Sequence, residues 1–286
     1  MRVDAHTHIL PPRLKEERAH WLQRDRTFAD LFASPRSQMA TAENLLTAMD
    51  EAGMHWAVVA GMGWTDPALA RLCNDYILEV SARWPDRLIP FISVNPLWGD
   101  DALREVERCA RAGARGVGEL HPDPQGWWQA VPPPLDALAE VLRKHRLALL
   151  VHASEPVGHL YPGKGKTTPD RLMHIRRVFS GVPLLLAHFG GGLPFYALMP
   201  EVSEALQETF FDSSASPFLY RPQVYRRVVD LVGAERILFA TDFPLLGYAR
   251  ALRHLEEGGL TPQEQALVLG GNAQRLFGLA EAPRPA

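Results

Sequence analysis

The sequence Val3-Asp4-Ala5-His6-Thr7-His8 opens the chain with a short β-like run that ends in two histidines. Side chains alternate between the two faces of a strand, so His6 and His8 point the same way. Two imidazoles on one face can bind a single cation, and neutral imidazole suits zinc and its first-row neighbours. This stretch therefore predicts a strand that carries part of a metal site.

Short apolar runs of this kind recur along the whole chain. Most are continuous in Val, Ile, Leu, Phe and Ala, which is typical of strands buried on both faces of a parallel sheet. The eight candidate strands cover residues 2–8, 56–62, 88–94, 115–120, 147–152, 183–188, 209–213 and 236–242.

The segments between these runs predict amphipathic helices with recognisable ends. Asp66 before Pro67 is an N-cap followed by proline at the first helical position, and Gly53 ends the preceding helix. Helices are expected over 41–52, from 67 past 80, and over 100–112, 135–145, 169–180, 194–207, 222–232 and 247–257, with a capping box at 261–264. Eight strand–helix repeats predict an α/β fold, the (β/α)8 TIM barrel, whereas an open doubly wound sheet fits eight even repeats less well.

No linker divides the 286 residues, so we expect a single-domain barrel over residues 1–279 and a short tail over 280–286. The segment 9–40, between the first two strands, is far longer than an ordinary strand-to-helix loop. It carries Trp21, Phe28, Leu31 and Phe32. We expect a lid-like insertion that faces the substrate and has a helix of its own.

Composition excludes several classes of function. The apolar content of 47%, the charged content of 22% and the net charge of −3 are ordinary for a globular protein and give no sign of nucleic-acid or membrane binding. Cys73 and Cys109 fall in helix-like segments and are expected to be reduced thiols. With no signal peptide and no apolar run of membrane-spanning length, a cytoplasmic enzyme acting on a small molecule is expected, and a homodimer stays open.

Metal-ligand residue types gather where the strands end. Catalytic groups of a parallel barrel come from the C-terminal strand ends and the loops after them. Six residues with suitable side chains fall there: His6, His8, Glu119, His152, His188 and Asp242. Their shared position predicts a metal site at this end of the barrel.

The order His-x-His, His, His and Asp resembles the amidohydrolase superfamily over nearly the whole chain. The motifs are Val3-Asp-Ala-His-Thr-His, Val151-His152, Ala187-His188-Phe-Gly-Gly, Ala240-Thr-Asp242-Phe-Pro and Gly271-Asn-Ala-Gln-Arg-Leu-Phe. The resemblance is greatest to the amidohydrolase-2 branch, which includes aminocarboxymuconate-semialdehyde decarboxylase and related hydrolases. It implies that His6, His8, His152 and Asp242 ligate a divalent metal. It also implies that His188 orients substrate, moves protons or binds a second metal.

Glu119 departs from the single-metal pattern of that branch. Its strand parity points the carboxylate inward, where an unpaired charge would be costly. In a deoxyribonuclease branch of the superfamily, a glutamate at this place bridges two metals. We therefore expect Glu119 to be a metal ligand, with a hydrogen-bonding role as the alternative. Asp4 is expected either to hydrogen-bond a ligand imidazole or to bind backbone at the barrel bottom.

Polar residues in two loops are candidates for substrate binding. His121 follows the fourth strand, and His159, Tyr161 and Lys164 lie in the loop after His152. That loop contains Gly158-x-x-x-x-Gly163-Lys164, but Gly165 replaces the Ser or Thr of a phosphate-binding loop, so a nucleotide site is not expected. A solvated loop is the alternative to substrate contact.

Two reactions fit such a site. A bound divalent ion lowers the pKa of its water to about 7, and Asp242 could take the proton while His188 stabilises oxyanion charge. The first expectation is hydrolysis of an amide, lactone or ester. The alternative is non-oxidative decarboxylation of a small unsaturated or aromatic carboxylic acid, and a non-catalytic metal-binding barrel comes third. We expect zinc, in one or two ions, with manganese or cobalt as alternatives.

Overall fold

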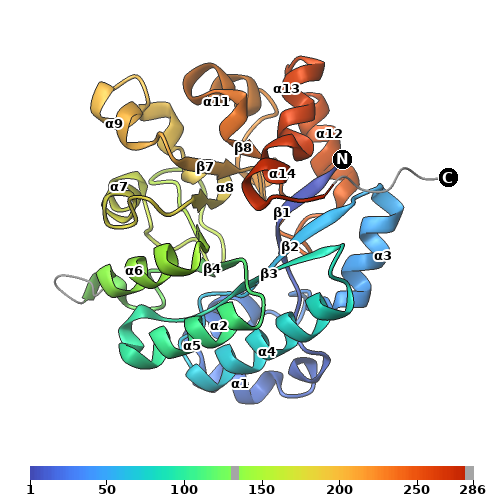
Figure 1. The fold of residues 1–286 in the computed structure, drawn as a ribbon. Helices are drawn as coiled ribbons and strands as arrows, with labels where there is room; N and C mark the ends of the chain where they lie inside the picture. Colours follow the sequence, from blue (N-terminus) through green and yellow to red (C-terminus); the bar gives the residue numbers. More distant parts are fainter. Residues whose placement is uncertain (130–134, 281–286) are drawn as a thin grey trace.

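Eight parallel strands form one sheet in the computed structural model, which describes residues 1–129 and 135–280 (Figure 1). Each strand pairs with the next along the chain. The strands are β1 Val3–His8, β2 Trp56–Ala60, β3 Leu88–Ile92, β4 Gly116–Leu120, β5 Ala148–Val151, β6 Leu184–Leu186, β7 Thr209–Asp212 and β8 Ile237–Leu238. The predicted (β/α)8 barrel is therefore confirmed. The predicted tail lies outside the described residues from 281 on.

Backbone hydrogen bonds from the first strand to the last close the barrel. Ala5 N donates to Phe239 O over 2.9 Å, and His8 N donates to Phe243 O over 2.7 Å. In the other direction, Asp242 N donates to His6 O over 2.9 Å. These bonds place the His-x-His stretch beside Asp242, although the two are at opposite ends of the chain.

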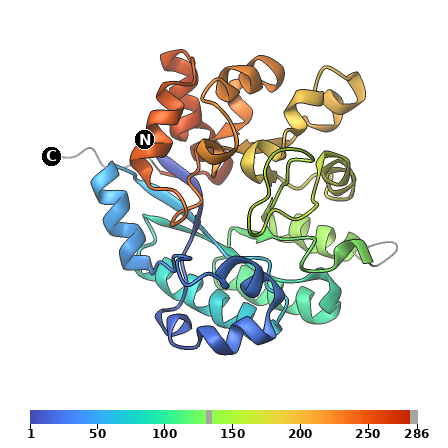
Figure 2. The same ribbon diagram turned by 180° about the vertical axis from the view of Figure 1, so that it is seen from behind.

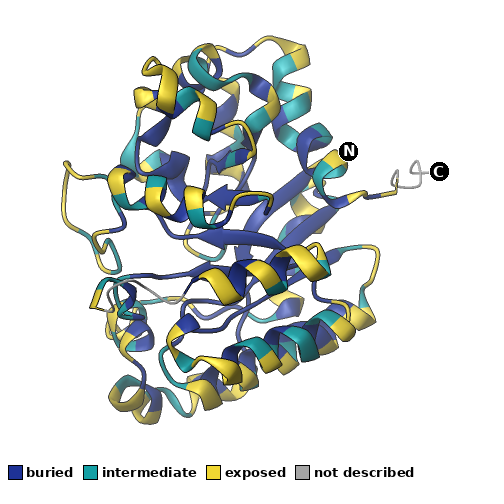
Figure 3. Ribbon diagram, turned by 60° about the vertical axis from the view of Figure 1, so that its left-hand side comes forward, coloured by how far each residue is buried: buried dark blue, intermediate teal, exposed yellow. Residues whose placement is uncertain are grey.

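Helices surround the strands and keep both faces of the sheet dry (Figure 3). Asp66 accepts hydrogen bonds from the backbone of Ala68 and Leu69 at the start of one helix, and Gly53 takes the left-handed conformation that ends another, as their sequence predicts. The outer helices are α3 Ala42–Ala52, α4 Pro67–Arg83, α5 Asp100–Arg111, α6 Asp136–His145, α7 Pro169–Val178, α9 Pro200–Ala205, α11 Val224–Val232, α12 Tyr248–Glu256, α13 Pro262–Ala266 and α14 Asn272–Phe277.

Two predicted elements differ from expectation in ways that bear on the site and the outer layer. The helix expected over 194–207 is divided into a 3-10 turn, Leu193–Tyr196, and α9, because Pro200 has no backbone N–H to continue a helix and instead begins a new one. The last strand stops well before Asp242, whose backbone has a left-handed φ of 64°. That conformation turns the chain out of the sheet and aims the carboxylate at the barrel end.

The insertion 9–40 contains a 3-10 turn, Pro12–Lys15, and two short helices, α1 Arg18–Arg24 and α2 Arg26–Phe32. Figure 2 brings this dark-blue segment to the front. It has an apolar cluster of its own, in which Phe28 lies 6.0 Å from Trp64 between ring centroids. Asp25 fastens it to the barrel, because its carboxylate accepts hydrogen bonds from the backbone of Phe28, Thr65 and Asp66.

Among the described residues, no helix is long and apolar enough to cross a membrane.

Candidate metal centre

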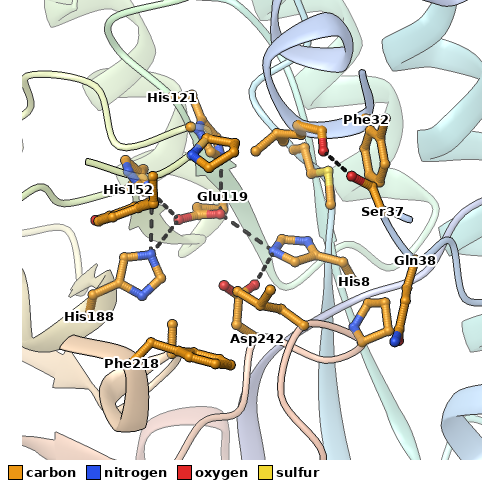
Figure 4. A pocket seen from close by; sticks show the side chains of 18 of the residues that line it. His8, Phe32, Ser37, Gln38, Glu119, His121, His152, His188, Phe218 and Asp242 are labelled. Carbon is orange, nitrogen blue, oxygen red and sulfur yellow. Dashed lines mark hydrogen bonds and ion pairs between the residues drawn. The ribbon is translucent and has the colours of Figure 1, made fainter. Parts of the chain in front are cut away.

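A pocket of about 450 Å³ opens at the C-terminal ends of the strands (Figure 4). Its floor is polar and its walls are largely apolar. The floor holds His8, Glu119, His121, His152, His188 and Asp242, and the walls include Leu31, Phe32, Met62, Phe218 and Leu219. The insertion also supplies Arg36, Ser37 and Gln38. The barrel thus places most of the predicted ligands under a cavity of ligand-binding size.

Two imidazoles from β1 face each other at the floor. His6 Nδ1 lies 2.9 Å from Asp212 Oδ2, and His8 Nδ1 lies 3.0 Å from the carbonyl of Ala60. Because both partners only accept, each ring donates its N–H through Nδ1 and carries a lone pair on Nε2. The two Nε2 atoms are 3.0 Å apart, so two lone pairs would meet unless a positive charge lies between them.

Asp242 and Glu119 complete this donor group. Asp242 Oδ1 lies 3.2 Å from His8 Nε2 and 3.8 Å from His6 Nε2. Glu119 Oε2 is 3.4 Å from the Nε2 atom of each of these histidines. Atoms that ligate one ion at about 2.0–2.2 Å lie about 3.0–3.6 Å apart, so the spacing fits a divalent metal.

A second pair of imidazoles approaches Glu119 from the other side. His152 Nδ1 lies 2.9 Å and His188 Nε2 lies 3.7 Å from Glu119 Oε1. The other nitrogen of each ring lies at hydrogen-bond distance from a backbone carbonyl: His152 Nε2 is 3.2 Å from Lys164 O, and His188 Nδ1 is 3.0 Å from Ser214 O. Figure 4 shows the Glu119 carboxylate between His8 on one side and the His152–His188 pair on the other.

The charges of this cluster favour a cation. Burial disfavours ionisation of Glu119, but the imidazoles of His121 and His6 outweigh it and hold its pKa well below the ordinary value. Burial likewise favours neutral His8, yet hydrogen bonds to Asp242 and Glu119 raise its pKa to about 9. The carboxylates thus stabilise positive charge at the His6–His8 pair, and a proton or a metal ion can supply that charge. The donor set supports a divalent metal.

Asp212 was missed in the sequence, although it ends the seventh strand as the other candidates end theirs. Its Oδ2 accepts from His6, while Oδ1 lies 3.1 Å from the backbone nitrogen of His188 and also accepts from Ser214. One carboxylate therefore orients histidines of both pairs. Asp4, in contrast, accepts hydrogen bonds from the backbone of His6 and from Thr241, so its carboxylate ties β1 to the segment after β8.

The four residues predicted to contact substrate divide into two groups. His121, His159 and Tyr161 line the pocket. His121 Nε2 also lies 3.0 Å from Glu119 Oε2, and its ring stacks on His152. The Lys164 ammonium instead donates to the carbonyls of Val157 and His159, both over 2.9 Å, and so holds its own loop together.

Comparison with known proteins identifies a family and relatives for the chain. The family model for amidohydrolases matches residues 3–279. Gamma-resorcylate decarboxylase from Polaromonas sp. is 24% identical over 258 residues, which cover 73% of this chain and 76% of the relative. The corresponding enzyme from Rhizobium radiobacter is 23% identical over 252 residues, covering 74% and 76%.

Several solved structures of similar fold are also decarboxylases. The 5-carboxyvanillate decarboxylase of Sphingomonas paucimobilis superposes with a TM-score of 0.76 at 19% identity, covering 98% of this chain and 99% of the other. A dihydroxybenzoic acid decarboxylase from Polaromonas sp., with bound manganese and 2-nitroresorcinol, gives 0.69 at 18% identity and covers 98% of each. The expectation of hydrolysis is wrong, because these relatives are decarboxylases and favour the alternative reaction.

Proposed function

This chain belongs to the amidohydrolase family, and from that premise we propose that it is a metal-dependent, non-oxidative decarboxylase of a small aromatic carboxylic acid. One observation carries the proposal: a buried cluster of imidazoles and carboxylates forms the floor of a pocket with aromatic and aliphatic walls. The similarity to gamma-resorcylate decarboxylases supports the same substrate class.

The pocket suits a flat, substituted ring. Phe32 and Phe218 offer apolar surface to its faces, and the cavity of about 450 Å³ lies in the lower part of the usual range for ligand pockets. Arg36 adds a cation at the lid. His121, His159 and Tyr161 can hydrogen-bond the ring substituents.

We assign the resident metal to His6, His8, Asp242 and Glu119. When bound, a divalent ion would supply Lewis-acid charge beside the oxygen atoms of the substrate. We propose manganese rather than zinc, because a similar structure holds manganese and two of the four side chains offer oxygen, which suits that ion. Elemental analysis of protein purified without added metal distinguishes the two.

The reaction itself requires a proton. Decarboxylation replaces the carboxylate on a ring carbon by hydrogen: the carbon gains a proton, its bond to the carboxyl carbon breaks, and carbon dioxide leaves. Asp242 suits the role of proton donor because its side chain is 15% exposed at the pocket floor. His188, which also lines the floor, can hold the carboxylate or return a proton to the site.

The test compares two activities in one preparation. The manganese-loaded protein is incubated with hydroxybenzoic acids and with aryl esters and lactones. We expect carbon dioxide release and the decarboxylated ring by NMR, and no ester cleavage. Asp242→Asn should reduce this release about 10²–10⁴-fold, as expected for loss of a general acid, and weaker metal binding would add to the loss. Turnover of esters without carbon dioxide release would overturn the proposal.

A further inference from the structure

Phe218 is a wall residue of the pocket that carries a cation on the side away from the cavity. It lies in the short helix α10 Ser216–Leu219, and its side chain is part of the pocket lining (Figure 4). The guanidinium carbon of Arg250 lies over this ring, 4.2 Å from its centroid, and Arg250 is outside the described lining of the pocket. We propose that Arg250 is a positioning residue that acts through Phe218 and shifts the preference of the pocket toward electron-rich aromatic rings. The inference rests on the proposed function, which supplies the aromatic ligand.

The helix that carries Arg250 holds the backbone on both sides of Phe218. A single helical turn such as α10 is not stable by itself, so its position depends on its neighbours. The Arg250 guanidinium donates to Pro217 O over 3.0 Å. One turn further along α12, His254 Nε2 donates to Tyr220 O over 3.1 Å. These two bonds fix the chain directly before Phe218 and two residues after it.

The stacked guanidinium also restrains the ring itself. Phe218 is 43% exposed, so apolar burial holds its side chain only in part. A planar guanidinium stacks on an aromatic ring because the faces of the ring carry negative partial charge. Arg250 thereby covers one side of the ring and leaves the side toward the cavity to a ligand. A ring that is already held in place loses less conformational freedom when a ligand stacks on it.

The cation changes what the cavity side of the Phe218 ring attracts. A guanidinium over one face draws π-electron density toward itself, so the opposite face becomes less negative. A ligand ring with electron-donating substituents then stacks more favourably, and one with electron-withdrawing substituents less so. Arg250 is exposed, and solvent screens its charge. We therefore expect an effect of about two- to fivefold in relative affinity, the size of an exposed cation–π interaction.

The experiment compares two acids of similar shape whose rings differ in electron density, para-methoxybenzoate and para-nitrobenzoate. Their dissociation constants are measured by calorimetry on the manganese-loaded protein, and the Kd of the nitro acid is divided by that of the methoxy acid. Arg250→Gln keeps a donor for Pro217 O but removes the cation, so this ratio should fall about two- to fivefold below wild type. Arg250→Lys, which keeps a cation that can lie over the ring, should restore part of the ratio.

Two further variants separate this effect from a purely structural one. Arg253→Gln is the control, because Arg253 lies exposed on the same helix and this variant should keep the wild-type ratio. In a Phe218→Leu background, Arg250→Gln should leave the ratio unchanged, because the ring through which Arg250 acts is gone. If Arg250 only held α10 in place, Arg250→Gln would weaken both acids equally and leave the ratio as in wild type.

The inference is overturned by an equal ratio in wild type and Arg250→Gln, or by the same change of ratio with and without the Phe218 ring. Binding is measured without turnover, so the result does not depend on decarboxylase activity. If both acids bind and only the ratio fails to change, the inference is refuted and the proposed function stands. If wild type binds neither acid, the proposal of an aromatic acid as substrate is refuted together with the inference.

Discussion

His188 and Asp242 share an unusual backbone at the level of single residues. Both have positive φ, 56° and 64°, which costs a residue other than glycine about 1–3 kcal/mol. Each lies where its chain segment leaves the sheet, and each presents its side chain to the pocket floor. This strained backbone turns both side chains toward the pocket floor.

Glu119 lines the pocket as predicted, but strict alternation does not put it there, because the β4–β5 register shifts between Val117 and Leu120 and Val117 packs under the outer helices. The position of Lys164 was not predictable, since its contacts depend on how a loop of thirteen residues, 154–166, folds back on itself. Asp212 could have been found by the same strand-end rule that identified His152. Arg36 could not, because nothing local tells which part of a long insertion reaches the pocket.

Gly63 provides a test at this scale. A Cβ atom there would lie 2.3 Å from the backbone nitrogen of His121 and 2.7 Å from its Cβ, so one chain must move. We expect Gly63→Ala to destabilise the fold by about 1–3 kcal/mol and to displace His121 from Glu119. Chemical denaturation and turnover measure the two effects. Gly247→Ala is the control, because a Cβ at Gly247 meets nothing within 4 Å; equal losses in both variants would refute the steric argument.

Capping residues and apolar spacing predict most of the secondary-structure elements. The prediction is wrong where two such signals in one segment disagree. Capping residues marked α3, α4 and α13, and apolar runs marked every strand. The prediction of one helix over 194–207 was wrong because it followed the apolar spacing and did not treat Pro200 as a break. The insertion was expected to have one helix and has two, separated at Asp25, a residue whose carboxylate serves both the second helix and the barrel.

Removal of the Asp25 carboxylate should loosen the insertion. Asp25→Ala deprives the backbone of Phe28, Thr65 and Asp66 of their acceptor, and loss of the helix cap alone costs about 0.5–2 kcal/mol. We expect faster hydrogen exchange over residues 9–40 and a higher KM, with the metal content unchanged. Mass spectrometry of exchange and steady-state kinetics check this. Unchanged exchange in that segment would show that its apolar cluster holds it without the carboxylate.

Glu105 should make the α4–α5 contact sensitive to acid. Burial would raise its pKa, but hydrogen bonds from Arg108 and Asn74 outweigh burial and lower the pKa below its ordinary value. A carboxyl whose pKa is lower in the folded state stabilises the fold above its unfolded pKa of about 4.3, and this stabilisation is lost as the pH falls through the folded value. We expect Glu105→Gln to have a lower Tm than wild type at pH 7.

The difference in Tm between wild type and Glu105→Gln should shrink as the pH falls below about 4. Thermal unfolding of both proteins between pH 3 and 7 measures it. Glu43→Gln serves as a comparison, because that carboxyl is exposed on α3 and its pKa is lowered mainly by its own backbone and Thr41. If the Tm difference between wild type and Glu105→Gln stays constant with pH, the charge of this carboxylate does not stabilise the fold.

The whole molecule is a ring whose joint lies at the candidate metal centre. β1 meets the segment that follows β8 through hydrogen bonds at Ala5, His6 and His8, and candidate ligands from both face each other there. The sequence was sufficient to predict the ring, because eight alternating repeats leave few other folds. It could not predict the reaction, since the candidate ligands suit both reactions and the pocket walls come from loops that are distant in the sequence.

Metal should therefore stabilise the fold as a whole. An ion that binds only the folded chain adds about 2.7 kcal/mol at a concentration one hundred times its Kd, which corresponds to roughly 4–5 °C in Tm for a chain of this size. We expect Mn²⁺ to raise the Tm of the chelated protein by this amount. Scanning calorimetry measures it, with Mg²⁺ at the same concentration as a comparison ion. The same Mn²⁺ effect in Asp242→Asn would place the stabilising ion elsewhere.

The closing bonds between β1 and β8 also set the order of events during synthesis. His6 and His8 leave the ribosome well before Asp242 and the strand that seals the ring, because they precede both in the sequence. At about 5–20 residues per second, the two imidazoles wait on the order of tens of seconds for the partners that complete their site. Throughout that interval the nascent chain offers only a weak, open pair of nitrogens to any cation nearby. The ion of the proposed function would therefore be selected by the closed barrel, after the segment that carries Asp242 has joined β1.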